Sequence, residues 1–322
     1  MFNLIKQKTT IFYLKLLKHP LQGRQLRKVT NLPNTKITVP KKYYFLGMVA
    51  IFKGEDDYLT EWIEFHKLMG VEHFILYDNG LRKSSRRILE PYIHSGLVTH
   101  ILLPHIEGSR DGKYIHTVST QQVAYADAIL RFRNNFRYLL QLDLDEFLFP
   151  KSHNSISEIL EMYDKRKVAR IEVNWTNFGS NGRVDKPNGL VIENFTKSSR
   201  NTIPKTVKSI SNTKYLSRFF IYTNVHRFSH RLSIKDMITK LFFGYPIIIK
   251  GEQANDLFQL NHYITKSKEE FLAKNRKFKE GWQIGKKTPE LYSELDNKYN
   301  QIDNTLILKF LPQMRNILNK SN

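Results

Sequence analysis

The chain has 322 residues and no cysteine, and its 51 Lys and Arg residues outnumber its 30 Asp and Glu residues, which gives a formal charge of +21. This length suits one large α/β unit or two domains, and 41% hydrophobic with 12% aromatic residues excludes a chain that is disordered throughout. The absence of cysteine excludes a disulfide scaffold, a thiolate zinc site and a cysteine nucleophile, and it fits a cytoplasmic enzyme. The positive charge predicts an acidic partner, which could be nucleic acid, an anionic membrane surface or a phosphorylated substrate.

The positive charge is unevenly distributed along the chain. Residues 1–42 contain 10 basic and no acidic side chains, residues 43–150 contain 11 basic and 14 acidic ones, and residues 151–250 contain 18 basic and 7 acidic ones. A domain that reads nucleic acid is rarely acidic, so no nucleic-acid partner is expected. A nucleic-acid-binding protein that uses the basic tail and middle is the competing class.

The N-terminal segment, residues 1–42, is expected to associate with a membrane without crossing it. Its longest apolar run, Ile11–Leu14, is too short for a signal peptide, and the apolar run Leu241–Ile249 is too short to span a bilayer. Apolar and lysine side chains alternate between Ile5 and Lys18, which predicts a basic amphipathic helix on an anionic membrane. A flexible tail and a helix docked on the body are the alternatives. We expect a cytoplasmic protein, peripheral on the inner face of the plasma membrane.

Strands and helices alternate between residues 43 and 150. In chain order the pattern predicts a strand at 44–51, a helix from the acidic residues 55–57 to Gly70, a strand at 73–77, a short helix at 86–93, a strand at 97–103, a helix at 115–131 and a strand at 138–142. This alternation predicts an α/β fold with a mostly parallel sheet covered by helices on both faces. Ligands bind beyond the carboxyl ends of such strands, where Glu55, Asp78, Asp143 and Asp145 fall.

The pair Asp143 and Asp145 follows a buried strand directly. Residues two apart in an extended segment point to the same side, so these carboxylates can hold a Mn²⁺ or Mg²⁺ ion that also takes phosphate oxygens. Such a metal offsets the charge that builds up on a leaving diphosphate. The alternative is a turn capped by aspartate side chains.

Four groups of residues resemble glycosyltransferases of family 2 and family 92 with a GT-A fold. They are Lys53–His66 with Gly70–Phe74 and Tyr77–Asn79, then Gln121, Gln122, Ala124 and Tyr125 with Leu142–Phe147, then Trp175 with Phe178–Gly182, and finally Asn261–Tyr263 with Lys266, Ser267 and Glu269–Phe271. The resemblance covers about residues 43–280. Gly54 departs from it, because the family usually has Asn between the Lys and the Glu.

The resemblance implies a division of the chain and a donor site. It implies a Rossmann-like GT-A domain at 43–280, with a nucleotide-sugar half at 43–150 and an acceptor half at 151–280, followed by a helical extension at 281–322. Donor binding is assigned to Lys53, Glu55, Asp78, Gln122 and Leu144. The metal is assigned to Asp143 and Asp145 with His262 as the third ligand, and His226 is the second choice for that position.

The acceptor side is assigned to Trp175, Phe178 and Gly179, although a core tryptophan beside a glycine-rich turn would give the same pattern. Inversion, which the resemblance implies, needs a general base. Glu193, expected on an edge strand, is the candidate, and Asp145 is the second catalytic residue through the metal. Basic side chains at Lys197, Arg200, Lys205, Lys208, Lys214 and Arg218 would face the diphosphate, an acidic glycan or lipid headgroups.

The predicted function is metal-dependent transfer of a sugar from a nucleotide-sugar donor to a glycan or glycolipid acceptor, in the synthesis of a surface polysaccharide or lipopolysaccharide. A nucleotidyltransferase or phosphotransferase shares the same metal and phosphate chemistry and is a further alternative.

Overall fold

The computed structural model describes residues 40–80, 82–103, 120–164, 166–202, 206–216, 226, 247–277 and 287–320. Nearly all of the basic segment 1–42, with its predicted amphipathic helix, lies outside these ranges. Within them, no helix combines the length and the apolar character that a membrane crossing requires.

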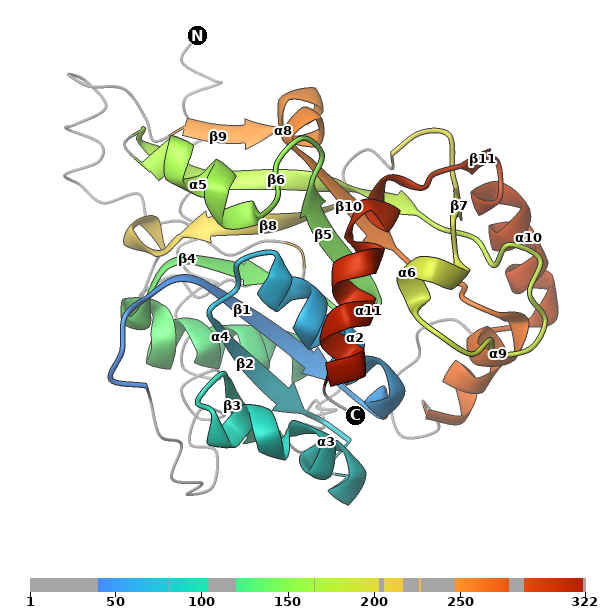
Figure 1. Cartoon of the computed structure of the whole chain (residues 1–322), viewed down its shortest axis with the longest axis horizontal. Coiled ribbons are helices and arrows are strands. Elements are labelled where there is room, and N and C mark those ends of the chain that lie inside the picture. The colour runs from blue at the N-terminus through green and yellow to red at the C-terminus, as the bar shows by residue number, and fades with distance from the viewer. Residues whose placement is uncertain are drawn as a thin grey trace, which may run out of the picture.

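The first half of the described chain alternates strand and helix as predicted (Figure 1). Its elements are β1 (Tyr44–Phe52), α2 (Asp56–Leu68), β2 (His73–Asp78), α3 (Lys83–His94), β3 (Val98–Leu102), α4 (Thr120–Phe132), the 3-10 turn η1 (Arg133–Asn135) and β4 (Phe136–Gln141). The strand β1 lies between β2 and β4 and is parallel to both, and β3 is parallel to β2. The helix α3 begins at Lys83 instead of near Arg86, and the first residues of the helix predicted at 115–131 lie outside the described ranges.

The second half extends the same sheet. Its elements are β5 (Glu146–Pro150), α5 (Ile156–Asp164), β6 (Val168–Asn177), α6 (Val191–Asn194), β7 (Lys197–Ser198), β8 (Val207–Asn212), η2 (Thr213–Tyr215), β9 (Ile247–Lys250), α8 (Glu252–Leu257), β10 (Phe258–His262), α9 (Lys268–Lys277), α10 (Pro289–Tyr299), β11 (Ile302–Asp303), η3 (Leu306–Phe310) and α11 (Leu311–Lys320). The strand order is β3-β2-β1-β4-β8-β6-β10-β5, with β9 paired to β6. The strand β8 is antiparallel to both of its neighbours, so the sheet is mixed and mostly parallel.

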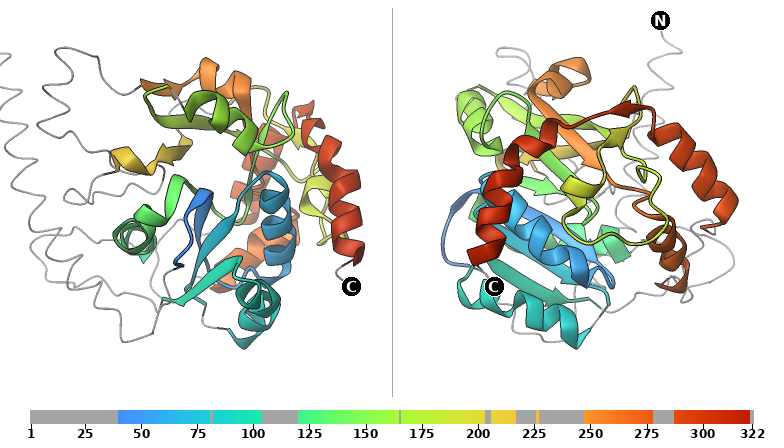
Figure 2. Two further views of the ribbon diagram at one scale, coloured as in Figure 1. Left: turned by 60° about the vertical axis from the view of Figure 1, so that its left-hand side comes forward. Right: turned by 45° about the vertical axis from the view of Figure 1, so that its right-hand side comes forward.

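Helices cover the first half of the sheet on both faces (Figure 2). Alternate residues of β1 explain this, because successive side chains of a strand point to opposite faces. Leu46 and Met48 pack in the cluster that includes α2 and α11 residues, whereas Val49 packs in the cluster that includes α4 residues. The predicted α/β fold is confirmed. The predicted boundaries of halves and extension remain predictions.

The helix α2 is joined to α6 by one buried carboxylate. Glu61 Oε2 accepts a hydrogen bond from the Val191 N–H at 2.8 Å, and its Oε1 accepts one from the Ile192 N–H at 3.1 Å. Burial raises the pKa of Glu61 to about 7, although these two hydrogen bonds oppose the shift. The segment predicted as an edge strand is therefore a short helix that carries Glu193, because Glu61 takes amide hydrogens that a strand would give to a neighbour.

The raised pKa of Glu61 predicts a pH-dependent contribution to stability. Because the pKa of this carboxyl group is raised in the folded state above its ordinary value of 4.5, its contribution to the stability of the protein falls as the pH rises from about 4.5 through about 7. The substitution Glu61→Gln keeps an oxygen acceptor without the charge. The unfolding free energy of this variant relative to wild type is expected to be about 1–3 kcal/mol higher at pH 8 than at pH 5. Urea unfolding at both pH values measures it. The exposed control Glu294→Gln should differ from wild type by less than about 0.5 kcal/mol at either pH. An equal Glu61→Gln effect at both pH values would contradict the prediction.

Candidate active site

The loop that carries the aspartate pair is fixed by a tryptophan. Trp62 Nε1, on α2, donates to the backbone oxygens of Asp143 at 3.1 Å and Glu146 at 3.0 Å. The turn closes on itself, because the Glu146 N–H donates to the Asp143 carbonyl at 3.0 Å and the Asp143 N–H donates to Glu146 Oε2 at 2.8 Å. The fully buried indole thus sets the position of residues 143–146 at the end of β4.

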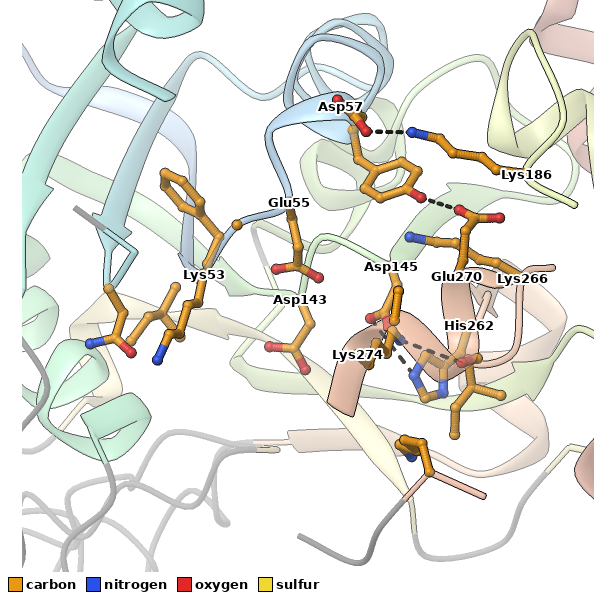
Figure 3. Close-up of a pocket in the computed structure, with 18 of the residues that line it drawn as sticks. Lys53, Glu55, Asp57, Asp143, Asp145, Lys186, His262, Lys266, Glu270 and Lys274 are labelled. Carbon is orange, nitrogen blue, oxygen red and sulfur yellow. Dashed lines mark hydrogen bonds and ion pairs between the residues drawn. The ribbon is translucent and has the colours of Figure 1, made fainter. Parts of the chain in front are cut away.

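A cavity of about 610 Å³ opens at this loop (Figure 3). It lies between the end of β1, the start of α2, the end of β10 and the first turns of α9. Five predicted site residues line it, namely Lys53, Glu55, Asp143, Asp145 and His262. The structure therefore brings predicted donor and metal residues together in one place.

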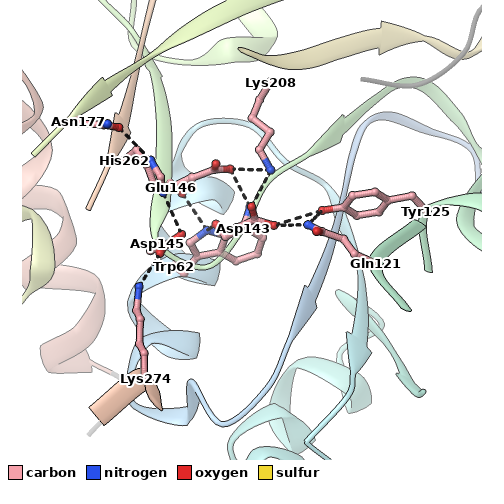
Figure 4. Close-up of polar contacts among 10 residues, drawn as sticks. All are labelled: Trp62, Gln121, Tyr125, Asp143, Asp145, Glu146, Asn177, Lys208, His262 and Lys274. Atoms are coloured by element: carbon pink, nitrogen blue, oxygen red, sulfur yellow. Dashed lines mark hydrogen bonds and ion pairs between the residues drawn. The ribbon is translucent and has the colours of Figure 1, made fainter. Parts of the chain in front are cut away.

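Asp143, whose side chain is 33% exposed, is bonded to an otherwise buried group of polar side chains (Figure 4). Its Oδ2 pairs with Lys208 Nζ, on β8, at 2.8 Å, and its Oδ1 accepts from Gln121 Nε2 at 2.8 Å. The same ammonium lies 3.2 Å from Glu146 Oε2. Burial alone would lower the pKa of Lys208, but the two carboxylates outweigh it and raise that pKa. Burial raises the pKa of Glu146. Lys208 was expected in a basic region that faces the diphosphate, an acidic glycan or lipid headgroups; its side chain is instead buried and holds Asp143 and Glu146.

Asp145 has a different set of partners. Lys274 Nζ, on α9, lies 3.1 Å from Asp145 Oδ2, and His262 Nε2 lies 3.8 Å from Asp145 Oδ1. Burial of Asp145 would raise its pKa, but the cations around it, Lys274 first, hold the pKa below its usual range. Burial lowers the pKa of His262 to about 4, which leaves the ring neutral at pH 7. Its Nδ1 is 2.9 Å from Asn177 Oδ1, so Nδ1–H donates a hydrogen bond to the amide oxygen and Nε2 presents its lone pair toward Asp145.

Three predicted donor residues do not line this cavity. Asp78 is fully buried; its Oδ1 accepts from the Gly80 N–H at 2.8 Å, and its Oδ2 lies 3.3 Å from His100 Nε2. Asp78 thus shapes the turn after β2, and the neighbouring Asn79 reaches the cavity. Leu144 is a core residue, and Gln121 lines the cavity in place of Gln122, because adjacent residues of a helix point about 100° apart.

The predicted acceptor residues lie beneath the cavity instead of on its wall. The Trp175 ring is 4.2 Å from the His262 ring and tilted by 40°, so it supports that histidine. Phe178 is fully buried, and Gly179 packs so closely against Asn300 that a side chain would not fit. The His226 ring also contacts the Trp175 ring, with 5.4 Å between the ring centres, and His226 does not line the cavity. Glu193 pairs with Arg315 of α11 and does not line the cavity.

Several residues of the site were given no role from the sequence, although Lys266 and Glu270 belong to the C-terminal group that carries the resemblance. Lys266 is buried, has a positive φ of 51°, and places its ammonium 3.3 Å from the centre of the Tyr58 ring. Burial lowers the pKa of Lys266 to about 8. Tyr58 in turn donates a hydrogen bond to Glu270. The sequence held one signal for Glu270, since Ser267 and Glu270 have the spacing of a helix capping box.

Comparison with known proteins decides the family. The sequence profile described as Glycosyltransferase family 92 matches residues 47–302. This chain belongs to glycosyltransferase family 92. The predicted resemblance is confirmed.

Individual relatives are distant. The family 92 chain is 24% identical over 197 residues to glycosyltransferase family 92 protein Os08g0121900 of Oryza sativa subsp. japonica, covering 61% of this chain and 31% of that protein. It is 28% identical over 142 residues to galactan beta-1,4-galactosyltransferase GALS3 of Arabidopsis thaliana, covering 43% and 27%. The chain spans about a third of the length of the curated relatives it matches.

Two solved structures are also similar. TarS of S. aureus in complex with UDP has 14% identity and a TM-score of 0.38, covering 67% of this chain and 60% of that one. Mannosyltransferase PcManGT from Pyrobaculum calidifontis in complex with GDP-Man and Mn²⁺ has 11% identity and a TM-score of 0.37, covering 81% and 67%.

The side chains at the site of this family 92 chain are suited to a hard divalent cation that is bound by only a few protein ligands. In the described ranges no three His, Asp or Glu side chains are grouped closely enough to hold a metal. The facing oxygen of Asp145 and nitrogen of His262 are nevertheless suited to one, because Asn177 fixes the histidine tautomer in the way that outer partners of metal ligands do. Mg²⁺ and similar ions commonly use one or two carboxylates and take the rest of their shell from water and phosphate.

Removal of Lys208 should destabilise this family 92 chain strongly. Lys208→Met removes the shared cation from the fully buried Glu146 and from the partly exposed Asp143, and breaking the buried Lys208–Glu146 pair costs about 3–5 kcal/mol. The exposed Lys214 just after β8 gives a matched control, and Lys214→Met should cost less than about 0.5 kcal/mol. Urea unfolding of both variants measures the difference. Equal stabilities would show that the buried charges need no common partner.

Proposed function

We propose that this family 92 chain transfers a sugar from a nucleotide-sugar donor to a glycan acceptor with the help of Mn²⁺ or Mg²⁺. The observation that carries the proposal is the cavity in which opposite charges meet. Asp143 and Asp145 offer carboxylates there for a cation, and Lys266 and Lys274 offer ammonium groups for a diphosphate. A nucleotide-sugar is the donor class that needs both, because its leaving group is a diphosphate.

The donor is proposed to bind with its nucleoside toward the first half of the sheet. Lys53, Asn79 and Gln121 line that side of the cavity, at the ends of β1 and β2 and at the start of α4. The diphosphate then lies near Lys266 and Lys274. Asp145 and His262, with Asp143 beside them, would hold the metal, which supplies positive charge opposite the leaving diphosphate.

The transferred sugar is proposed to be a hexose, with inversion at its anomeric carbon. The name of the Arabidopsis thaliana relative, a galactan beta-1,4-galactosyltransferase, supports galactose as the first sugar to test. We place the acceptor in a surface polysaccharide or lipopolysaccharide, which the family membership supports at the level of glycan synthesis.

The metal assignment predicts a loss of metal-dependent nucleotide binding. Calorimetric titration of UDP and of GDP, with and without Mn²⁺, should show metal-dependent binding to the wild type, and Asp145→Asn should weaken it by about tenfold or more, which corresponds to about 1.4 kcal/mol. Asp303→Asn, an exposed site on β11, is the control and should bind as the wild type does. Metal-independent binding in the wild type would refute the proposed role of the cation.

The products of donor breakdown separate the proposed function from nucleotidyl transfer. With Mn²⁺ and a UDP-hexose but no acceptor, slow release of UDP is expected. Release of pyrophosphate or of a sugar phosphate would contradict glycosyl transfer and favour a nucleotidyltransferase or phosphotransferase.

We also propose that the basic segment 1–42 holds the protein at an anionic membrane. Its 10 basic and no acidic side chains support this, since each Lys or Arg near such a surface contributes about 1 kcal/mol. Deletion of residues 1–39 should abolish co-sedimentation with vesicles that contain 30% phosphatidylserine and leave donor hydrolysis unchanged. The full chain should not sediment with purely phosphatidylcholine vesicles. Equal sedimentation of full and shortened chains would refute the proposal.

A further inference from the structure

A second, smaller cavity of about 210 Å³ adjoins the cavity of about 610 Å³ described above, which is the proposed donor cavity. Both cavities are lined by Asp57, Tyr58, Lys186 and Glu270. These four residues therefore form the partition between the two spaces. Two contacts close it: the ion pair of Asp57 with Lys186 (Figure 3), and the hydrogen bond from the Tyr58 hydroxyl to Glu270.

The lining of the small cavity suits an uncharged sugar. Asp57, Glu61 and Glu270 contribute carboxylates, whereas Lys186 is the single cation among the described residues that line it. This balance disfavours a uronic acid or a phosphorylated sugar. Carboxylate, ammonium and amide groups hydrogen-bond readily to hydroxyls, and the side chains of Asp57, Lys186 and Asn188 supply such groups in the lining.

We propose that this small cavity binds the terminal sugar of the acceptor as a neutral pyranose, with its reacting hydroxyl directed through the partition onto Glu270. This inference rests on the proposed function and adds to it the place and the class of the acceptor. The cavity has room for one ring. Preceding sugars of the acceptor leave along a third cavity of about 1070 Å³ beside α2 and α3, which shares Asp57, Glu61 and Gly189 with the small one.

Glu270 is fixed in position by its own helix. Its Oε2 accepts from the Ser267 N–H at 3.1 Å and from the Ser267 hydroxyl at 2.7 Å, while the Glu270 N–H donates to Ser267 Oγ at 3.2 Å. This reciprocal capping at the start of α9 leaves Oε1 directed at the partition. Oε1 there accepts the phenol O–H of Tyr58, so the position already receives a hydroxyl hydrogen bond of the kind that an acceptor would supply.

The reaction step then balances without a further reactant. The acceptor hydroxyl gives its proton to Glu270 Oε1 as its oxygen forms a bond to the anomeric carbon. The bond from that carbon to the diphosphate oxygen breaks, and its electron pair leaves with the diphosphate, whose charge is met by Lys266 and Lys274.

Paired substitutions test the acceptor site separately from the donor site. Asn188 lines the small cavity but not the donor cavity, and Asn79 lines the donor cavity but not the small one. With a UDP-hexose, Mn²⁺ and β-1,4-galactobiose, lactose or cellobiose as acceptor, Asn188→Ala should raise the acceptor KM by about fivefold or more and leave the donor KM unchanged. Asn79→Ala should raise the donor KM and spare the acceptor KM. The opposite pattern would overturn the assignment of the small cavity.

Glu270→Gln tests the proton acceptor. Glutamine keeps the capping box, so the variant should fold with the thermal midpoint of the wild type within a few degrees and bind UDP with Mn²⁺ within about threefold. Its kcat should fall at least about 100-fold, while the donor and acceptor KM values should stay within about threefold of wild type. Tyr58→Phe, which removes the competing hydroxyl alone, should lose less than about tenfold. A Glu270→Gln variant that transfers at the wild-type rate would overturn the role of Glu270.

The outcomes also distinguish the two levels of inference. A wild type that neither binds UDP with Mn²⁺ nor releases UDP from a donor refutes the proposed function itself. A wild type that does both, but transfers to none of the three neutral disaccharides and does transfer to an acidic glycan such as a galacturonan, overturns only the neutral acceptor. Transfer to none of these sugars also overturns it.

Discussion

The structure depends on the confinement of three carboxylates within four residues at the end of a buried strand. Asp143, Asp145 and Glu146 stand on a turn that the Trp62 indole holds from α2. Negative charges so close together repel each other, so each carboxylate needs a cation or a hydrogen-bond donor beside it. Lys208 on β8 serves two of them and Lys274 on α9 serves the third. These pairs connect the turn to β8, the strand next to β4, and to α9.

The two lysines differ in their surroundings. Lys208 is enclosed between Asp143 and Glu146 and belongs to the permanent framework. Lys274 is partly accessible and stands at the cavity wall. Asp143 thus shares a fully buried cation with Glu146, whereas Asp145 is paired with a cation that lines the cavity.

The sequence was sufficient to predict the first half of the sheet because local pattern and tertiary structure agree there. The apolar runs, the acidic first turn of α2 and the aspartates after β4 all act over a few residues. The positions of Lys208, Lys266 and Lys274 depend on contacts between segments more than 60 residues apart, as in the Asp143–Lys208 pair, and no local pattern reveals these. The same reason explains Glu193, which resembled a carboxylate on an edge strand but is turned toward Arg315 by the short helix that Glu61 holds. Gln122 shows that sequence-based prediction can also fail by one residue, because a motif does not indicate which of two adjacent helical side chains faces a cavity.

The strand β8 has a mechanical consequence. It is hydrogen-bonded to β4 on one side and to β6 on the other, so the two halves of the molecule share one continuous sheet. Moving them apart as two jaws would break rows of backbone hydrogen bonds in the interior, at a cost that ordinary thermal motion does not meet. For the proposed transfer, substrate and product would therefore exchange at the rim of the cavity, where the Asp57–Lys186 pair and the side chain of Lys274 stand, and the sheet would stay in place as a rigid floor.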